Sequence, residues 1–446
     1  KCRETHHSVN LNNKPLKIKI MQKKITLRLF LALSLALMQT NAFAQVPSQE
    51  AYVNLNSTGV NVPVPLTNIT NGAKSIEYTL TRNGEVIETK TIALNGAGRT
   101  RSNQTLNVVV PPSTDPTVDE LALNITKVNG QPTNTTEPYT TITRTTLTQT
   151  PKRKVVVEDF TGMWCPWCPR GMAVLSYLTR THPNDFIGIA VHNSDALECD
   201  DYSGIRVSGY PTVRFDRRTD TNDYTGESTF RSEQNRGAEM DVKVFAAWDE
   251  WKRNISITTR TTFRVSKYNS HYALAYVLLA DGLQSRSYYQ KNGFAGGYQY
   301  RGYSQDLDFF VNSSNPVYNL KFDHTAIAAL GVTRGLQGSI STPIVADKVQ
   351  VHQTAFKNIS QYSLIQDKSK LSVCVLVINT QTGEIVNADK CEISDHTSTG
   401  IENAPTTGEV VEVARYNAAG CRISQPTRGL NIVKYSDGRT VKEIVK

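Results

Sequence analysis

Residues 154–171 read KVVVEDFTGMWCPWCPRG, and this stretch decides how the chain is organised. KVVVEDF is a nearly continuous apolar run, which is typical of a strand buried on both faces of a sheet. The residues after the second cysteine, PRGMAVLSYLTRTH, space their apolar side chains as a helix does. Cys165 and Cys168 therefore form a Cys-x-x-Cys pair between a buried strand and a helix.

This position favours redox chemistry for the pair. A cysteine at the start of a helix lies beside free backbone N–H groups and the positive end of the helix dipole, which stabilise its thiolate. We expect Cys165 at that position, exposed, with Pro166 as the first helical residue. Cys168, one turn later, is placed to resolve a mixed disulfide.

Strands and helices continue to alternate after the pair. DFIGIAVHN is a second buried strand, and DDYSGIRVSGYPTVRFD predicts a short helix, a turn and a strand. A closing helix is expected near residues 228–240. This alternation predicts an α/β domain over residues 151–240.

The flanking regions read as all-β. In residues 45–150, alternating apolar residues and the turns Asn83-Gly84 and Asn129-Gly130 predict hairpins in an immunoglobulin-like β-sandwich. Residues 241–395 predict a second β-sandwich, with DEWKRN as a turn between strands in preference to the end of a helix.

The two ends of the chain carry different signals. Residues 1–20 form an upstream extension, whereas residues 21–44 combine basic residues, a short apolar run and the small residues of AFAQ, as a cleaved signal peptide does. No run is long enough to span a bilayer. Residues 396–407 are a polar linker, and residues 408–446 predict a tail of short β-strands with a Ser-Asp-Gly turn.

The charge balance argues against nucleic acid as a partner. Residues 1–44 hold 8 of the 49 lysines and arginines and 1 of the 40 aspartates and glutamates, which leaves 41 against 39 in the rest of the chain. The net charge of that remainder is +2, so the basic character belongs mainly to the leader. Export also permits disulfides.

A second disulfide follows from the spacing of one hairpin. If Thr382-Gly383 is a two-residue loop, paired residues sum to 765, as Cys374 and Cys391 do. Such a non-hydrogen-bonded pair has Cα atoms about 4.5 Å apart, within the range that a disulfide spans. We therefore expect a Cys374–Cys391 bridge, unless a β-bulge shifts the register.

The stretch VVVEDFTGMWCPWC resembles the thioredoxin superfamily. The resemblance implies that Asp159 is a buried acid serving proton transfer, and that Pro211 in GYPT is a cis-proline facing the disulfide. Pro-Trp stands between the cysteines where thioredoxin has Gly-Pro, and Pro169 follows the second cysteine. A redox potential therefore does not carry over.

Over roughly residues 150–395, EDFTGMWCPWCPRG with IAVHN and GYPTVRF is similar to the outer-membrane-protein-28-related envelope proteins of Bacteroidota. The tail, ending in GLNIVKYSDGRTVKEIVK, resembles the β-sandwich sorting domains of type IX secretion. Together these resemblances imply a protein of the periplasm, outer membrane or cell surface.

Other residues around the pair allow more than one interpretation. Trp164, Trp167, Tyr210 and His192 are candidates for a substrate groove. Cys165, Cys168, His192 and Cys199 also have ligand chemistry for zinc or copper, although no second Cys-x-x-Cys supports a metal. The aromatic residues 288–303, YYQKNGFAGGYQYRGY, fit either an adaptable binding surface or a loop packed on the sandwich.

Besides a metal carrier that would use Cys165, Cys168 and His192, two functions remain. The first is an exported thiol–disulfide oxidoreductase that acts on cysteines of other exported proteins and needs no cofactor beyond its own disulfide. Cys165 would be the nucleophile, Cys168 the resolving cysteine and Asp159 the proton relay, with Pro211 shaping the groove. The second is an adhesin-like surface protein in which the thioredoxin-like α/β domain, between two β-sandwiches, is only a scaffold.

Overall fold

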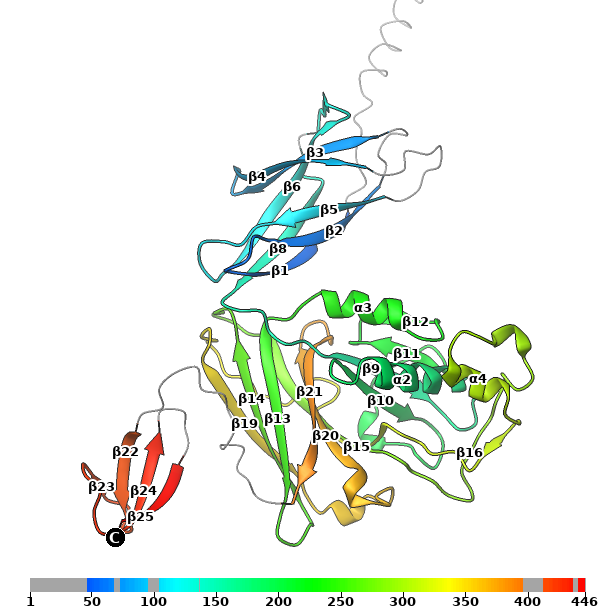
Figure 1. Cartoon of the computed structure of the whole chain (residues 1–446), viewed down its shortest axis with the longest axis vertical. Helices are drawn as coiled ribbons and strands as arrows, with labels where there is room; N and C mark the ends of the chain where they lie inside the picture. Colours follow the sequence, from blue (N-terminus) through cyan, green and yellow to red (C-terminus); the bar gives the residue numbers. More distant parts are fainter. Residues whose placement is uncertain are drawn as a thin grey trace, which may run out of the picture. The chain divides into compact units, whose positions relative to one another are not determined.

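The computed structural model describes residues 46–67, 73–94, 104–135, 137–395, 412–435 and 440–445 (Figure 1). These residues divide into two compact units, one lying largely within residues 46–144 and the other containing most of the chain from Thr145 onward. The expected upstream extension, signal peptide and linker lie outside the described residues. Within the described ranges, no helix is long and apolar enough to cross a membrane.

The N-terminal unit is built from antiparallel strands. One sheet has the order β1-β8-β6-β3-β4 with β7 beside β6, and β2 pairs with β5 in a second sheet. The Tyr78 hydroxyl of β3 accepts a hydrogen bond from Val109 N of β5, so the two sheets meet. Asn83-Gly84 and Asn129-Gly130 have positive φ and join the two predicted hairpins. The strands are β1 (Gln49–Asn54), β2 (Val60–Leu66), β3 (Ser75–Arg82), β4 (Glu85–Ala93), β5 (Gln104–Val110), β6 (Val118–Val128), β7 (Gln131–Pro132) and β8 (Thr140–Leu147).

The second unit begins with the expected alternation of strands and helices. Every residue of β9 and β10 is buried, and the two strands, which helix α2 connects along the chain, pair in parallel. β11 pairs antiparallel to β9, which gives the order β10-β9-β11-β12. The closing helix ends at Asn235, earlier than predicted, because Met240 already begins the next strand. The elements are β9 (Val155–Thr161), α2 (Pro169–Thr181), β10 (Phe186–His192), η1 (Asp200–Tyr202), β11 (Thr212–Phe215), β12 (Thr219–Thr221) and α3 (Glu227–Asn235).

This sheet does not stop at residue 240. It continues as β10-β18-β15-β20-β21-β13-β14-β19, giving eleven strands in one sheet. The predicted boundary at residue 240 therefore does not divide the sheet, because β18 lies beside β10, with Thr325 opposite Ala190, and links the two regions. The predicted turn between β13 and β14 is confirmed. These strands are β13 (Met240–Trp248), β14 (Ile255–Phe263), β15 (Tyr272–Ala280), β18 (Thr325–Leu330), β19 (Val349–Phe356), β20 (Leu371–Asn379) and β21 (Ile385–Ser394).

The strands β15 and β20 lie at the centre of the core and are buried on both faces. Tyr276 and Leu278 face the side chains of β13 and β14, such as Val244. On the other face, Val277 packs in the same cluster as Ile189 of β10. One pair of strands thus belongs to the hydrophobic cores of both regions, which explains why they share a sheet.

A long connection between β15 and β18 forms no part of the main sheet. It contains β16 (Tyr289–Gln290), η2 (Tyr298–Tyr300), α4 (Gln305–Val311) and β17 (Val317–Tyr318). Helix α4 packs on helix α2 through Leu307 and Phe310 against Ala173. Arg180 and Asp306 add an ion pair of 2.7 Å between these helices.

The expected Cys374–Cys391 disulfide is wrong. Both thiols are free, because Cys374 lies opposite Lys390 and Cys391 lies opposite Val373. The loop is longer than the assumed two residues, because Asn379 N donates to Glu384 O and Ile378 pairs with Ile385, so paired residues sum to 763 beside the turn. A register shift between Val377 and Ile378 then changes the sum to 764, one less than the 765 that would align the two cysteines. Since neighbouring residues of a strand point to opposite faces, the slip turns the two thiols away from each other.

The described part of the tail is one antiparallel sheet of order β23-β22-β24-β25. Arg415 forms ion pairs of 2.8 Å with both Glu412 and Glu443. The predicted Ser-Asp-Gly turn lies outside the described residues. The remaining elements are η3 (Ile359–Gln361), η4 (Lys368–Lys370), β22 (Glu412–Asn417), β23 (Arg422–Ile423), β24 (Gly429–Tyr435) and β25 (Thr440–Val445).

Candidate functional site

The two cysteines of the CPWC motif form a disulfide, with Cα atoms 5.4 Å apart. Helix α2 starts at Pro169 with Cys168 as its N-cap residue, so the expectation of a helix starting at Pro166 is wrong. Pro169 fits this position because its missing N–H would have no partner inside the helix. Cys165 is only 2% exposed, against 0% for Cys168, which corrects the expectation of an exposed nucleophile.

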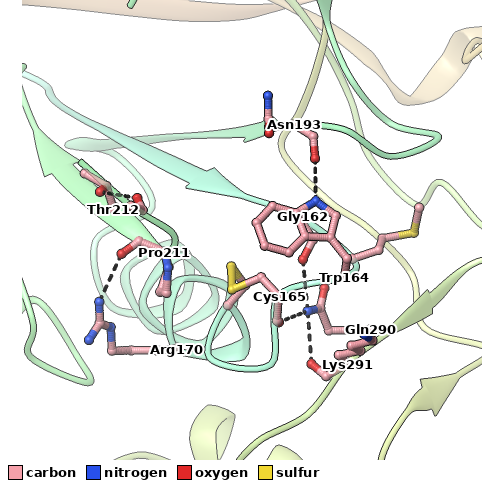
Figure 2. The surroundings of a disulfide bond; sticks show 12 residues. Gly162, Trp164, Cys165, Arg170, Asn193, Pro211, Thr212, Gln290 and Lys291 are labelled. Atoms are coloured by element: carbon pink, nitrogen blue, oxygen red, sulfur yellow. Dashed lines mark hydrogen bonds between the residues drawn. A yellow bond between two sulfur atoms is a disulfide. The ribbon is translucent and has the colours of Figure 1, made fainter. Parts of the chain in front are cut away.

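The long connection after β15 covers the motif. Lys291 N donates to Met163 O at 2.8 Å, and Gly293 N donates to Pro166 O at 2.6 Å. The side-chain amide of Gln290 donates to Cys165 O at 2.9 Å (Figure 2). The first half of the segment 288–303 therefore binds the CPWC loop, while Tyr288 packs on the hydrophobic cluster of β13, β14 and β15, as one interpretation expected, and Tyr298 and Tyr303 remain exposed.

Gln290 is a site residue that sequence reasoning missed. Its side chain is completely buried, and its amide also donates to Gly162 O at 3.3 Å. No local signal identifies it, because Gln290 is far from the cysteines along the chain and stands in a segment without a recognisable motif.

The two tryptophans of the motif occupy different surroundings. Trp164 donates from Nε1 to Asn193 O at 2.7 Å and meets Tyr210 edge-on, with ring centroids 5.5 Å apart. Trp167 is 47% exposed and meets Phe294 edge-on at 5.3 Å. Trp164 therefore fixes the loop, whereas Trp167 presents an apolar surface beside the disulfide.

Pro211 lies beside the disulfide, at the start of β11 (Figure 2). The Tyr210–Pro211 peptide bond is cis, as the resemblance to thioredoxins implies. Thr212 Oγ1 donates to Gly209 O at 2.8 Å, which closes this turn. Arg170 Nη2 donates to Pro211 O at 3.3 Å and connects the turn to helix α2.

His192 ends strand β10 and acts through a neighbouring carboxylate. Its Nδ1 lies 2.8 Å from Asp195 Oδ2, which also accepts a hydrogen bond from Met163 N at 2.7 Å. Burial raises the pKa of Asp195, but the hydrogen bond and charge of His192 and the backbone donors outweigh it, and the net pKa is lowered. His192 thus holds the loop before the cysteines.

Cys199, the fourth residue considered as a metal ligand, lies in apolar surroundings. Cys199 is buried in the apolar cluster of β10 and β15, and burial raises the pKa of its thiol to about 11. Across the described residues, no group of three or more His, Cys, Asp or Glu side chains is arranged to hold a metal.

Asp159 is a fully buried acid beneath helix α2. Neither of its carboxylate oxygens has a hydrogen-bond partner among the described residues. Burial raises its pKa to about 8, although the charge of Arg170 acts in the opposite direction. A Cβ atom at Gly171 would lie 2.1 Å from Asp159 Oδ1, so glycine is required where the helix passes over this carboxyl group.

The preceding residue, Glu158, belongs to a buried ion pair that the sequence analysis missed. Its carboxylate is 2.7 Å from Arg217 Nη2 and 2.9 Å from Arg217 Nε. Arg217 also donates from Nη1 to Val332 O on the far side of β10. Because side chains alternate along a strand, the sequence could have predicted that Glu158 and Asp159 point to opposite faces of the sheet. It could not have predicted that Arg217 pairs with Glu158.

No family model and no curated protein matches this chain. Among solved structures, HBP35 of Porphyromonas gingivalis gives a TM-score of 0.39 at 14% identity, covering 66% of this chain and 99% of that chain. A protein of Agrobacterium tumefaciens gives 0.30 at 14%, covering 56% and 97%. A domain of the outer membrane lipoprotein Omp28 from Porphyromonas gingivalis gives 0.19 at 14%, covering 36% and 92%. Likenesses this distant establish neither a family nor a function.

Proposed function

We propose that this protein is an exported protein of the cell envelope whose thioredoxin-like module exchanges disulfides with cysteines of other exported proteins. The observation that carries the proposal is the buried, unpartnered carboxyl group of Asp159 beneath the helix that follows the CPWC disulfide. A structural disulfide has no need of such a group, and burying it without a partner costs free energy.

The arrangement of the module supports the same proposal. The strand order β10-β9-β11-β12, with β9 and β10 parallel around α2, is the order expected of a thioredoxin-like fold. The disulfide lies between the end of β9 and the start of α2, and the cis peptide bond before Pro211 lies beside it. The acid, the disulfide and the proline thus come together from three elements.

The exchange itself involves only cysteine sulfur and one proton acceptor. The Cys165 thiolate attacks a substrate disulfide, forming a mixed disulfide and releasing one substrate thiolate. The Cys168 thiol passes its proton to the Asp159 carboxylate and then attacks Cys165 Sγ. The bond between Cys165 and the substrate breaks, and its electron pair leaves on the second substrate sulfur.

The test combines a potential with a trapping experiment. We expect the Cys165–Cys168 pair to titrate reversibly against glutathione or dithiothreitol and to reduce insulin disulfides. Cys168→Ser should accumulate mixed disulfides with partner proteins, whereas Cys165→Ser should trap far fewer. A pair that is reduced only when the domain unfolds would refute the proposal.

One observation favours the second candidate function, an adhesin-like protein with this module as a scaffold. Cys165 is 2% exposed, and Gln290, Lys291 and Gly293 bind the CPWC loop. Such burial suits a disulfide that stabilises a loop. The two candidates differ in the trapping experiment, because a structural disulfide leaves no mixed disulfides.

We also infer that the tail is a sorting domain of the type IX kind, which would place the protein at the cell surface. Its four strands pair only with one another among the described residues. Removing residues 408–446 should therefore leave the rest of the chain folded and retain it in the periplasm. Unchanged surface display of this chain would exclude a sorting role.

A further inference from the structure

The first turn of α2 brings a second charged residue to the proposed exchange site. Arg170 is partly buried, and its Nη2 donates to Pro211 O at 3.3 Å. Figure 2 shows the guanidinium group reaching from the helix toward Pro211. Its Nε is buried and has no hydrogen-bond partner among the described residues. One side chain therefore joins the helix after the disulfide to the cis-proline turn.

The same side chain interacts with Asp159. Both carboxylate oxygens of Asp159 are shielded from water and lack hydrogen-bond partners in the described structure. No ion pair joins the two groups in the described structure. Burial raises the pKa of Asp159, and the positive charge of Arg170 acts against this by favouring the carboxylate. In a medium of low dielectric constant such an attraction acts without direct contact. Gly171, directly after Arg170, leaves the space that the carboxyl group occupies.

We propose that Arg170 is a positioning residue that couples the buried acid Asp159 to the substrate groove at Pro211. This inference rests on the proposed exchange function. The hydrogen bond to Pro211 O fixes the groove, while the charge of Arg170 favours the ionised form of Asp159, which is the form that accepts the proton of Cys168. A substrate that displaces Arg170 from Pro211 O would move its positive charge relative to Asp159 and so alter proton transfer in the resolving step.

Few other ionisable groups face this pair. Cys168 contributes a thiol only when the disulfide is reduced, and Tyr224, which is near enough to affect the pKa of Arg170, packs against Tyr300 and Tyr303. Burial raises the pKa of Tyr224, so its hydroxyl remains neutral near pH 7. Arginine keeps its charge throughout this range. The effect of a substitution at Arg170 should therefore appear in the pKa of Asp159.

The experiment measures the pKa of Asp159 by carbon NMR of the labelled carboxyl group in the oxidised full chain. Removing an opposite charge should raise this pKa by about one unit or more in Arg170→Met, which is about a tenfold change in proton affinity. Arg170→Lys keeps the charge and should retain most of the effect. Arg180→Met, near the end of the same helix, is the matched control and should leave the pKa of Asp159 unchanged.

A second measurement separates this inference from the proposed function. In a single turnover, Arg170→Met should shift the pH profile for resolution of the mixed disulfide upward, together with the pKa of Asp159. An unchanged pKa of Asp159 in Arg170→Met would overturn the inference even if the wild type is active. A shifted pKa in a protein that exchanges no disulfides would refute the proposed function but keep the electrostatic coupling. If Arg170→Met does not fold, Arg170→Gln, which also removes the charge, is compared with Arg170→Lys, which keeps it.

Discussion

Two neighbouring acids on strand β9 have opposite surroundings. Glu158 and Asp159 are both fully buried, and they point to opposite faces of the same sheet. On one face Glu158 accepts hydrogen bonds from both Nε and Nη2 of Arg217. On the other face Asp159 meets helix α2 at Gly171, without a hydrogen-bond partner among the described residues. The fold therefore neutralises one charge and leaves the other to respond to pH.

The difference separates a structural carboxylate from a reactive one. A buried charge with a complete set of partners contributes to packing and fixes the elements that it joins, here β9 and the turn at Arg217. A buried carboxyl group without partners holds its proton near neutral pH and can exchange it. Each of the following predictions tests the surroundings of either Glu158 or Asp159.

The largest loss of stability should come from breaking the ion pair between Glu158 and Arg217. Arg217→Met leaves Glu158 as an uncompensated buried charge, and we expect a loss of about 4 kcal/mol in the free energy of unfolding. Urea denaturation at neutral pH measures this loss. The double variant Glu158→Met with Arg217→Met should recover much of it, because no unpaired charge then remains.

The control for that prediction is Arg214→Met on the adjacent strand β11. Arg214 pairs with Asp220, which is 48% exposed, so solvent screens this interaction. Its loss should cost less than about 1 kcal/mol. A similar cost for Arg214→Met and Arg217→Met would show that the buried pair has no special role in stability.

The second prediction concerns how Asp159, the acid without a partner among the described residues, makes the stability of the protein depend on pH. Because the pKa of Asp159 is raised from 3.8 to about 8, the folded protein keeps a proton that the unfolded chain has already released. This contribution to stability is present at low pH and is lost as the pH rises through the folded pKa. Between pH 5 and 8, the wild type should lose about 3 kcal/mol relative to Asp159→Asn.

Urea denaturation of the oxidised protein at several pH values tests this expectation. Asp220→Asn serves as the control, since Asp220 is half exposed and should not produce a comparable slope. If the wild type and Asp159→Asn show the same pH dependence, Asp159 is already ionised in the folded protein, and the contrast with Glu158 disappears.

The smallest effect should come from filling the space over Asp159. Gly171→Ala places a methyl group against the carboxyl oxygen, and overpacking of this kind costs about 2 kcal/mol. Thermal or urea unfolding measures it. The cost of Gly171→Ala should fall when Asp159→Ala is also present, because the second change removes the obstructing atoms.

Gly209→Ala is the matched control for that cycle. A Cβ atom at Gly209 would meet no atom within 4 Å, so alanine should fit the turn before Pro211 without loss of stability. Equal costs for Gly171→Ala with and without Asp159 would place the steric conflict elsewhere in helix α2.

The sequence predicted those features whose signals lie within a few residues of each other. The Asn-Gly turns gave the hairpins of the N-terminal unit, since positive φ at these residues favours tight turns. The apolar run before CPWC predicted a fully buried strand, and the spacing after it predicted helix α2. Local periodicity reports burial directly, which explains these successes.

The errors of prediction concern contacts between distant residues. The hairpin of β20 and β21 has a longer loop than the predicted two residues and a register shift beyond it, and together these separate Cys374 from Cys391. The pairing of β10 with β18 merges two predicted domains into one sheet. Gln290 reaches Cys165 O from a connection that has no motif of its own. Each depends on which surfaces meet after the chain has folded.

The residue pair Glu158 and Asp159 shows where the boundary lies. By itself, the sequence determined that two acids stand on a buried strand before a Cys-x-x-Cys pair, because strand periodicity and burial are local properties. Only the tertiary structure decided that Arg217 would come to one face and Gly171 to the other. The physical reason is that the charge state of a buried acid depends on desolvation and on the partners that long-range packing brings to it.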